Sequence, residues 1–455
     1  MIADPPAAGR FRTRGHDRAV GAVRAMVAGH PPHALLIGGP GGIGKTTLAL
    51  DLAAGLLCDD PDPAARPCRA CRGCRLVDRG IHPDVQRLAP AGPGDQIRIG
   101  TREHPEDGTI RRLALDLSLL PVEGGARVAI LERADRMGDD AQTAILKTLE
   151  EPPAGVTIIL CADDEDRLMP TVRSRCARIR LGPVAVREIE AILAEGELAD
   201  PPLGARLARL SGGRPGLARS LALAPDAIAA RDEIARTLLH LIGAGPSDRL
   251  GSARGLLDRA AELDRSLERA TLEAAASDGS GTGAASRGGK GGSRRSARAG
   301  AGRSPATADV TEAVAGEDTA ESGEAEATAS PAMSASAAQR RKAAATVVGL
   351  WRELTRDLVV ARLGVEREVR DPGLLDDLRD AAATLGRTTD ETGPRERTAF
   401  PGGAPGSDPV AASLTGFLVR LDAAGELLEA NARPELVVDT LLLAWPFAAV
   451  DGPSR

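Results

Sequence analysis

Residues 33–57 read HALLIGGPGGIGKTTLALDLAAGLL, and this stretch decides the fold. Its first six residues form a short apolar run typical of a buried parallel strand, and residues 46–57 have the amphipathic pattern of a helix. Between them lies a glycine-rich loop, Gly39-Pro40-Gly41-Gly42-Ile43-Gly44-Lys45-Thr46, followed by Thr47. Glycines let the backbone N–H groups turn toward a phosphate, Lys45 reaches the outer phosphates, and the Thr46 hydroxyl can bind Mg²⁺. The helix behind the loop offers its positive end to the same anion, so the pattern predicts a nucleotide-binding loop.

The composition narrows the class of protein. A chain of 455 residues is long enough for more than one domain. A net charge of −6 argues against a protein that coats nucleic acid unaided, and four Phe, two Trp and no Tyr leave few side chains for stacking on bases. No apolar run approaches the roughly 20 residues of a membrane span, and the N-terminus lacks the apolar stretch of a signal peptide. We therefore expect a cytoplasmic protein without a membrane partner.

Strand-like and helix-like segments alternate from residue 33 to residue 183. The strand-like segments after the first are short and rich in β-branched residues or Leu, and they lie at 84–88, 126–131, 156–161 and 177–181. Five such strands joined by helical crossovers predict an α/β fold with a five-stranded parallel sheet of the P-loop NTPase type. We expect this nucleotide-binding core to occupy residues 1–183.

The rest of the chain is predicted to be helical, with one interruption. Residues 184–222 read as a small helical lid, and residues 223–275 together with 338–455 read as an all-α C-terminal domain. Apolar residues recur at helical spacing in segments 347–358, 414–428 and 436–445. The interruption is at residues 276–337, which consist mainly of Gly, Ser, Ala, Thr and charged residues, with almost nothing to bury. The charged residues are basic in the first half and acidic in the second. Such a composition predicts a disordered insert.

Four cysteines follow the predicted nucleotide-binding helix with the spacing C-x9-C-x2-C-x2-C, at Cys58, Cys68, Cys71 and Cys74. Four thiolates around Zn²⁺ make a closed tetrahedral site, which would hold the 58–74 loop in shape and leave no position for a reactive water. An iron–sulfur cluster and free thiols are the alternatives; ferredoxin-like runs, however, place the fourth cysteine downstream. Cys161 ends an apolar strand and reads as ordinary core.

The combination of these features resembles a known family. A phosphate loop, a cysteine insert behind its helix, the segment AILKTLEEPP at 144–153 and Ser174-Arg175-Cys176 are similar to the clamp-loader subunits of bacterial DNA polymerase III. These are AAA+ proteins with a nucleotide-binding core, a helical lid and an α-helical collar. The resemblance runs from about residue 15 to the C-terminus and implies bound ATP or ADP with Mg²⁺.

Two members of that family share these features, the tau/gamma motor and the delta-prime subunit. In the motor, the strand ending at Leu131 would be followed by Asp-Glu, whereas this chain has Glu132-Arg133. Glu132 can support a magnesium shell, but Arg133 has no acceptor with which to orient water. The lid segment around Arg214 and the C-terminal helices also resemble delta-prime, although the phosphate loop is complete here. We expect a subunit that binds nucleotide and hydrolyses it slowly, if at all.

The resemblance implies a role for Arg175 in a neighbouring subunit. In the family, the Ser-Arg-Cys arginine reaches across a subunit boundary and stabilises charge on a neighbour's ATP. The implied partners are the tau/gamma motor and delta subunits in a hetero-pentamer, the sliding clamp, and primed DNA through the complex. Collar segments 350–360 and 436–445 are expected to form the oligomer contact.

Three other readings stay open at this point. The chain could be the motor ATPase subunit of the same complex, or an independent AAA+ remodelling ATPase, which would need a water-orienting carboxylate. It could also be a metal-stabilised interaction module whose phosphate loop is a relic. For Arg175, the alternative is a solvated basic loop, because Arg173, Arg178 and Arg180 crowd the same stretch.

Overall fold

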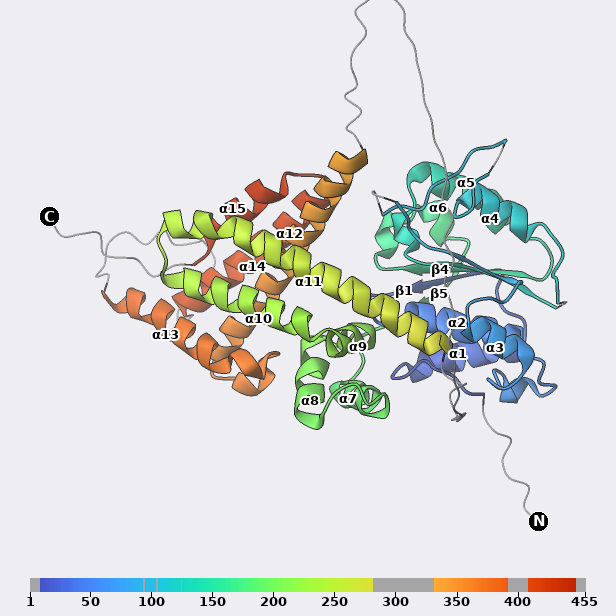
Figure 1. Cartoon of the computed structure of the whole chain (residues 1–455), viewed down its shortest axis with the longest axis horizontal. Helices are drawn as coiled ribbons and strands as arrows, with labels where there is room; N and C mark the ends of the chain where they lie inside the picture. Colours follow the sequence, from blue (N-terminus) through green and yellow to red (C-terminus); the bar gives the residue numbers. More distant parts are fainter. Residues whose placement is uncertain are drawn as a thin grey trace, which may run out of the picture.

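The computed structural model describes residues 9–280, 331–391 and 408–446, apart from short gaps at 93–94, 104 and 124. The α/β core, with the sheet at its centre, lies beside an elongated array of helices (Figure 1). Most of the predicted insert, residues 281–330, lies outside the described residues. Its predicted edges are wrong: helix α11 (Pro246–Ser280) continues past 276, and helix α12 (Pro331–Arg362) begins before 337. Both edges are alanine-rich, and alanine has the highest helix propensity.

Five parallel strands form the sheet in the order β2-β3-β4-β1-β5. The strands are β1 (Ala34–Gly38), β2 (Val85–Leu88), β3 (Arg127–Leu131), β4 (Val156–Ala162) and β5 (Ala177–Arg180). Every hydrogen-bonded pair is parallel, and each strand lies within a residue or so of its predicted bounds. The predicted α/β fold of the P-loop NTPase type is confirmed.

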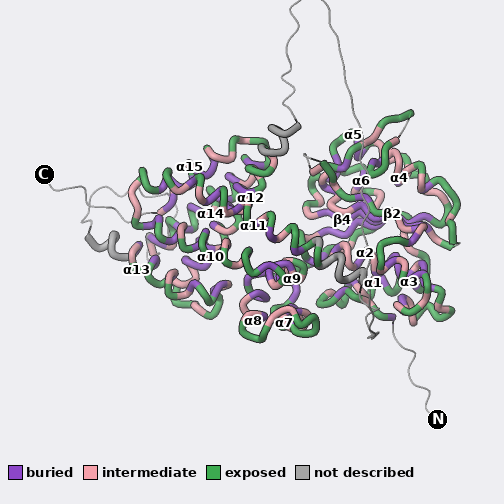
Figure 2. The backbone as a smooth tube through the Cα atoms, viewed as in Figure 1, coloured by how far each residue is buried: buried purple, intermediate pink, exposed green. Residues whose placement is uncertain are grey.

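Helices cover both faces of the sheet because alternate strand residues point to opposite sides. Leu35 and Ile37 of β1 pack with α1 (Asp17–Ala28), α2 (Lys45–Leu56) and α3 (Arg72–Asp78). Ala34 and Leu36 pack on the other face with α4 (Ile110–Leu117), α5 (Asp139–Glu150) and α6 (Pro170–Arg173). Figure 2 shows the strands as a buried layer between more exposed helices.

Three short helices form the lid, α7 (Val186–Glu195), α8 (Pro201–Leu210) and α9 (Pro215–Leu223). Their buried faces join the same apolar cluster as the C-terminal helices. A charged network also joins the lid to the rest of the helical array: Arg206 of α8 donates to Asp371 at 3.0 Å, and Arg231 of α10 donates to the same carboxylate at 2.7 Å. The lid is therefore attached to the collar as well as to the core.

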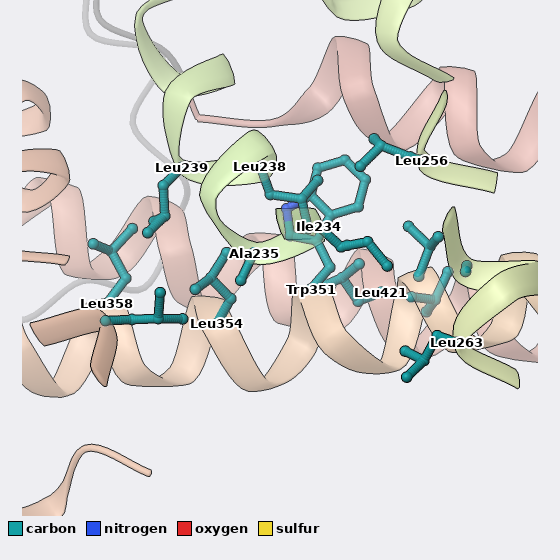
Figure 3. Packing of buried hydrophobic residues seen from close by; sticks show 14 of the residues in the cluster. Ile234, Ala235, Leu238, Leu239, Leu256, Leu263, Trp351, Leu354, Leu358 and Leu421 are labelled. Carbon is teal, nitrogen blue, oxygen red and sulfur yellow. The ribbon is translucent and has the colours of Figure 1, made fainter. Parts of the chain in front are cut away.

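The collar consists of α10 (Pro225–His240), α11, α12, α13 (Leu375–Glu391), α14 (Pro409–Glu429) and α15 (Pro434–Ala444). Its centre is an aromatic cluster in which the Trp351 ring centroid lies 5.3 Å from those of Phe417 and Trp445. Leucines and Ile234 surround Trp351 (Figure 3). Short 3-10 turns complete the described chain at Pro63–Ala65, Ala134–Arg136, Glu165–Arg167, Leu241–Gly243, Glu366–Glu368 and Pro372–Leu374.

Much of the apolar surface expected to contact other subunits is used inside the chain itself. Trp351, Leu354 and Leu358 of α12 are buried in the collar core, as are Leu442 and Trp445 at the end of α15. Only flanking residues such as Leu436 and Leu443 remain exposed. Periodicity marks a buried face without saying what buries it, and here the collar core buries most of the apolar residues of segments 350–360 and 436–445. The oligomer contact expected there stays a prediction, which would use the residues that are exposed. Among the described helices, none is both long and apolar enough to span a membrane.

Candidate nucleotide and metal sites

The predicted phosphate loop lies between the carboxyl end of β1 and the start of α2. Gly39, Gly42 and Gly44 have φ angles of +145°, +76° and +113°, a region that residues with a Cβ rarely adopt. Gly44 is the N-cap of α2, so the helix begins at Lys45 and its positive end faces the loop. Thr46 and Thr47 are half-buried in the first turn of that helix. The backbone thus has the conformation that the sequence predicts for a phosphate cradle.

Lys45 is buried beneath the loop and fully engaged with protein groups. Its Nζ donates to the Gly39 carbonyl at 2.5 Å, to the Pro40 carbonyl at 2.9 Å and to Asp163 Oδ1 at 2.5 Å. Asp163 directly follows β4, the strand next to β1, and it lies outside the motifs that mark the loop in the sequence. The signal that points to it is its place at the carboxyl end of a neighbouring strand, where ligands bind in open α/β sheets. A bound phosphate would compete with this carboxylate for Lys45.

The lid and the N-terminal segment both touch the loop. The Gly216 N–H in the first turn of α9 donates to the Gly42 carbonyl at 2.8 Å. A Cβ at Gly216 would lie 3.0 Å from that oxygen, so this close approach favours glycine. On the other side, His16 Nε2 lies 3.0 Å from the Ile43 carbonyl. The loop is therefore in direct contact with both the lid and the N-terminal segment.

Acidic groups near the end of β3 already have partners. Glu132 accepts from Arg87 Nε at 2.8 Å, and Asp135 Oδ1 accepts from the Asp163 backbone N–H at 2.8 Å. Arg133 forms a two-armed pair with Asp95, at 3.1 and 2.6 Å. Glu132 therefore lies on the same side of the sheet as the phosphate loop, and Arg87 balances its charge. Arg133 directs its guanidinium at the Asp95 carboxylate. Neither side chain is arranged as a general base.

Two further residues singled out from the sequence have structural partners. Arg214, the N-cap residue of α9, donates to the Ser211 carbonyl at 2.8 Å and lies 3.7 Å from Glu353 of collar helix α12. Its charge is thus directed at the collar. Cys161 is buried at the end of β4, and burial, aided by the Glu132 charge, raises the pKa of its thiol to about 12. Its prediction as an inert core residue is confirmed.

The four clustered cysteines come together as the spacing predicts. Their Sγ atoms all lie within 4.8 Å of one another, and Cys71 Sγ is 3.9 Å from Cys58 Sγ. A tetrahedral site with metal–sulfur bonds of about 2.3 Å requires sulfur–sulfur distances of about 3.8 Å, so the arrangement can hold a metal ion. Backbone N–H groups of Cys68, Cys71 and Cys74 donate to preceding cysteine sulfurs at 3.3–3.4 Å.

These sulfurs are in different electrostatic surroundings. Burial raises the pKa of the Cys74 thiol. Burial also favours a higher pKa for the Cys68 thiol. Hydrogen bonds from the Ala70 and Cys71 N–H groups outweigh burial and lower the pKa of Cys68 to about 7. A bound cation would offset the cost of burying four thiolates, which is the general reason that such clusters bind metal.

A buried ion pair links this cysteine loop to the phosphate-loop helix. Asp51 of α2 is completely buried and accepts from the Thr13 N–H at 2.9 Å and its hydroxyl at 2.7 Å. Arg69, between the second and third cysteines, donates to the same carboxylate. The loop thus supplies the positive charge that balances a carboxylate six residues after Lys45.

Arg175 lies near the amino ends of the parallel strands, whereas the phosphate loop lies at their carboxyl ends. In the β1–β5 register, Leu35 is opposite Ala177 and Gly38 is opposite Arg180. Arg175 precedes the start of β5 and the loop follows the end of β1, so the strand alone separates them by roughly 10 Å. The Arg175 side chain is half-exposed and pairs with Glu150 at the end of α5. It therefore points away from the nucleotide site of its own chain.

The sheet order, the phosphate loop and the helical lid define a P-loop NTPase of the AAA+ class. The family model described as "DNA polymerase III, delta subunit" matches residues 20–185. The amino-terminal core is thus similar to that of DNA polymerase III delta-family subunits, as the sequence motifs predict.

Individual relatives among the DNA polymerase III subunits are similar to part of this chain. The chain is 37% identical over 192 residues to DNA polymerase III subunit delta' of Pseudomonas aeruginosa, covering 42% of this chain and 55% of that one. It is 34% identical over 224 residues to subunit delta' of Escherichia coli, covering 49% and 64%. Subunit tau of Salmonella typhimurium is 34% identical over 205 residues, covering 44% and 30%. The chain therefore spans about half to two thirds of the length of these delta' relatives.

Among solved structures, a gamma subunit-related protein of DNA polymerase III from Thermotoga maritima covers 94% of this chain at 15% identity, with a TM-score of 0.37.

Proposed function

We propose that this chain is the delta-prime subunit of a DNA polymerase III clamp loader, which helps to place the sliding clamp on primed DNA. The observation that carries the proposal is the position of Arg175. It stands at the amino ends of the strands, away from its own phosphate loop and in a half-exposed turn, which supports a role in a site outside its own chain. The partners that follow are the tau/gamma motor and delta subunits in a hetero-pentamer.

The choice of delta-prime over the motor rests on the acidic end of β3. A motor subunit needs a carboxylate that orients the attacking water, and at that position Arg133 is paired with Asp95. We infer that the chain binds ATP or ADP with Mg²⁺ through residues 39–47, with Glu132 near the metal, and that it hydrolyses ATP slowly. If the chain alone hydrolysed ATP at rates typical of AAA+ motors, the motor assignment would replace this one.

The proposal also covers the domain bounds and the metal site. Residues 1–183 form the core, 184–222 the lid, and the helices before and after the insert form the collar. Cys58, Cys68, Cys71 and Cys74 hold a structural Zn²⁺, which supplies a cross-link and no reaction.

The test of the arginine role is Arg175→Ala in the assembled complex. A guanidinium delivered in trans is worth orders of magnitude in rate, so ATP hydrolysis by the complex should fall at least tenfold. The variant should still assemble, which is measured by its co-elution with the motor and delta subunits. Arg178→Ala, an exposed arginine three residues away, is the matched control and should leave the rate within twofold. An unchanged rate in the Arg175 variant would refute the role.

Nucleotide binding is tested by Lys45→Ala. Loss of a charge-assisted bond to phosphate costs about 1.5–3 kcal/mol, so the dissociation constant for Mg-ATP should rise at least tenfold. Lys147→Ala, at an exposed position of α5, is the control. Equal affinity of wild type and Lys45→Ala would mean that the loop holds no nucleotide, as in the interaction-module reading.

A further inference from the structure

The segment at 144–153 contributes to the family resemblance, yet nothing so far gives it a task. Its helix, α5, ends at Glu150, and its last residues lead into the amino end of β4. Arg175 lies in the turn that leads into β5, at the same edge of the sheet. The two motifs are 25 residues apart in sequence, and the fold brings their charged side chains into contact.

Arg175 is held by two partners in this turn. One Nη donates to the Thr171 carbonyl at 2.8 Å, and the other forms an ion pair with Glu150 Oε1. A guanidinium has five N–H groups, so these two bonds leave others free to meet phosphate oxygens. The Glu150 and Arg175 side chains retain 47% and 34% of their exposure, so the pair is accessible from outside the chain.

Neighbouring arginines have carboxylates of their own. Arg173 donates to Asp166 at 2.5 Å, and Arg180 donates to Glu165 at 3.1 Å. Each of these arginines thus has a separate acidic partner, and Glu150 is the acidic residue that pairs with Arg175.

We propose that Glu150 is a positioning residue that presents Arg175 to the ATP site of a neighbouring subunit. This inference rests on the proposed function. The carboxylate fixes the direction of a long, flexible side chain before the neighbour arrives, so less freedom is lost when the guanidinium meets the triphosphate. A half-exposed pair is weak, so its removal should cost a few-fold in rate, whereas loss of the arginine costs far more.

The experiment measures steady-state ATP hydrolysis by the assembled clamp loader. Glu150→Gln should lower kcat about three- to tenfold and change KM for ATP less than twofold, because the neighbour's own loop binds the nucleotide. Glu151→Gln removes the next carboxylate, which is exposed, and should change neither value. In the Arg175→Ala background, Glu150→Gln should have no further effect, because it acts through that arginine alone.

Melting temperature and co-elution with the partner subunits establish that each variant folds and assembles. If kcat is unchanged in Glu150→Gln while Arg175→Ala is slow, the positioning role is wrong and the proposed function stands. A rise in kcat would mean that Glu150 restrains the arginine, and additive losses in the double variant would mean that it acts elsewhere; either overturns the inference. If Arg175→Ala is itself as fast as wild type, the proposed function fails and this inference fails with it.

Discussion

At the scale of single residues, Lys45 is held in place by groups of the phosphate loop and of the neighbouring strand end. Its ammonium donates to two loop carbonyls and to Asp163. The loop's glycines allow the positive φ angles of its backbone. A triphosphate that binds Lys45 would have to replace some of these three acceptors. Asp163 would therefore compete with a bound nucleotide for Lys45.

We expect Asp163→Asn to raise the affinity for Mg-ATP about three- to tenfold, because the amide binds the ammonium more weakly than the carboxylate does. Titration with a fluorescent ATP analogue measures this. Asp164→Asn, whose side chain caps the following 3-10 turn, is the neighbouring control. Weaker binding in Asp163→Asn would show instead that this carboxylate assists the nucleotide or its Mg²⁺.

At the scale of elements, the cysteine loop and helix α2 act as one unit. Arg69 occupies a left-handed backbone conformation between two cysteines, and from there it reaches the buried carboxylate of Asp51. The cysteine loop thus carries the positive charge that pairs with the buried carboxylate of α2.

Replacing Arg69 with alanine should lower the free energy of unfolding by about 3 kcal/mol, because it leaves the Asp51 carboxylate buried without its charge partner. Arg72→Ala removes an exposed arginine of the same loop and should cost less than about 1 kcal/mol. Denaturant unfolding measures both changes, and metal analysis of the purified variants should give one Zn²⁺ per chain in each. A loss in Arg69→Ala no larger than in Arg72→Ala would contradict this coupling.

At the scale of the whole molecule, Asp371 is the buried anion that joins lid to collar. Burial raises its pKa, but the hydrogen bond from Arg206 and the charge of Arg231 outweigh burial and hold the pKa below its ordinary 3.8. A depressed pKa means that the carboxylate stabilises the folded state above pH 3.8 and that this contribution is lost as the pH falls through the lower, folded-state value.

Asp371→Asn should therefore lower the free energy of unfolding by about 3 kcal/mol at pH 7, and the difference from wild type should narrow below about pH 4. Urea unfolding at pH 7 and at acid pH measures it. Asp376→Asn, with a side chain that is 94% exposed, should have almost no effect at either pH. A difference that stays constant with pH would mean that the carboxylate's charge is not what stabilises this joint.

The sequence by itself determined the parts of this protein whose chemistry is local. Glycines with a lysine behind an apolar strand specify a phosphate loop, strict short spacing brings most of a thiolate cluster together, and strand-helix alternation specifies a parallel sheet. The Ser-Arg-Cys motif was equally visible. Each of these features depends on neighbours within a few residues of one another.

Only the tertiary structure decided which distant groups meet. The pairs Lys45–Asp163, Arg69–Asp51 and Arg175–Glu150 join residues that no local period links. Likewise, the sequence shows the helical period of the apolar residues in α12 and α15, but only the fold shows that these residues are buried in their own collar. The physical reason is that periodicity and spacing encode the geometry of one element, whereas ion pairing and burial depend on how several elements pack in space.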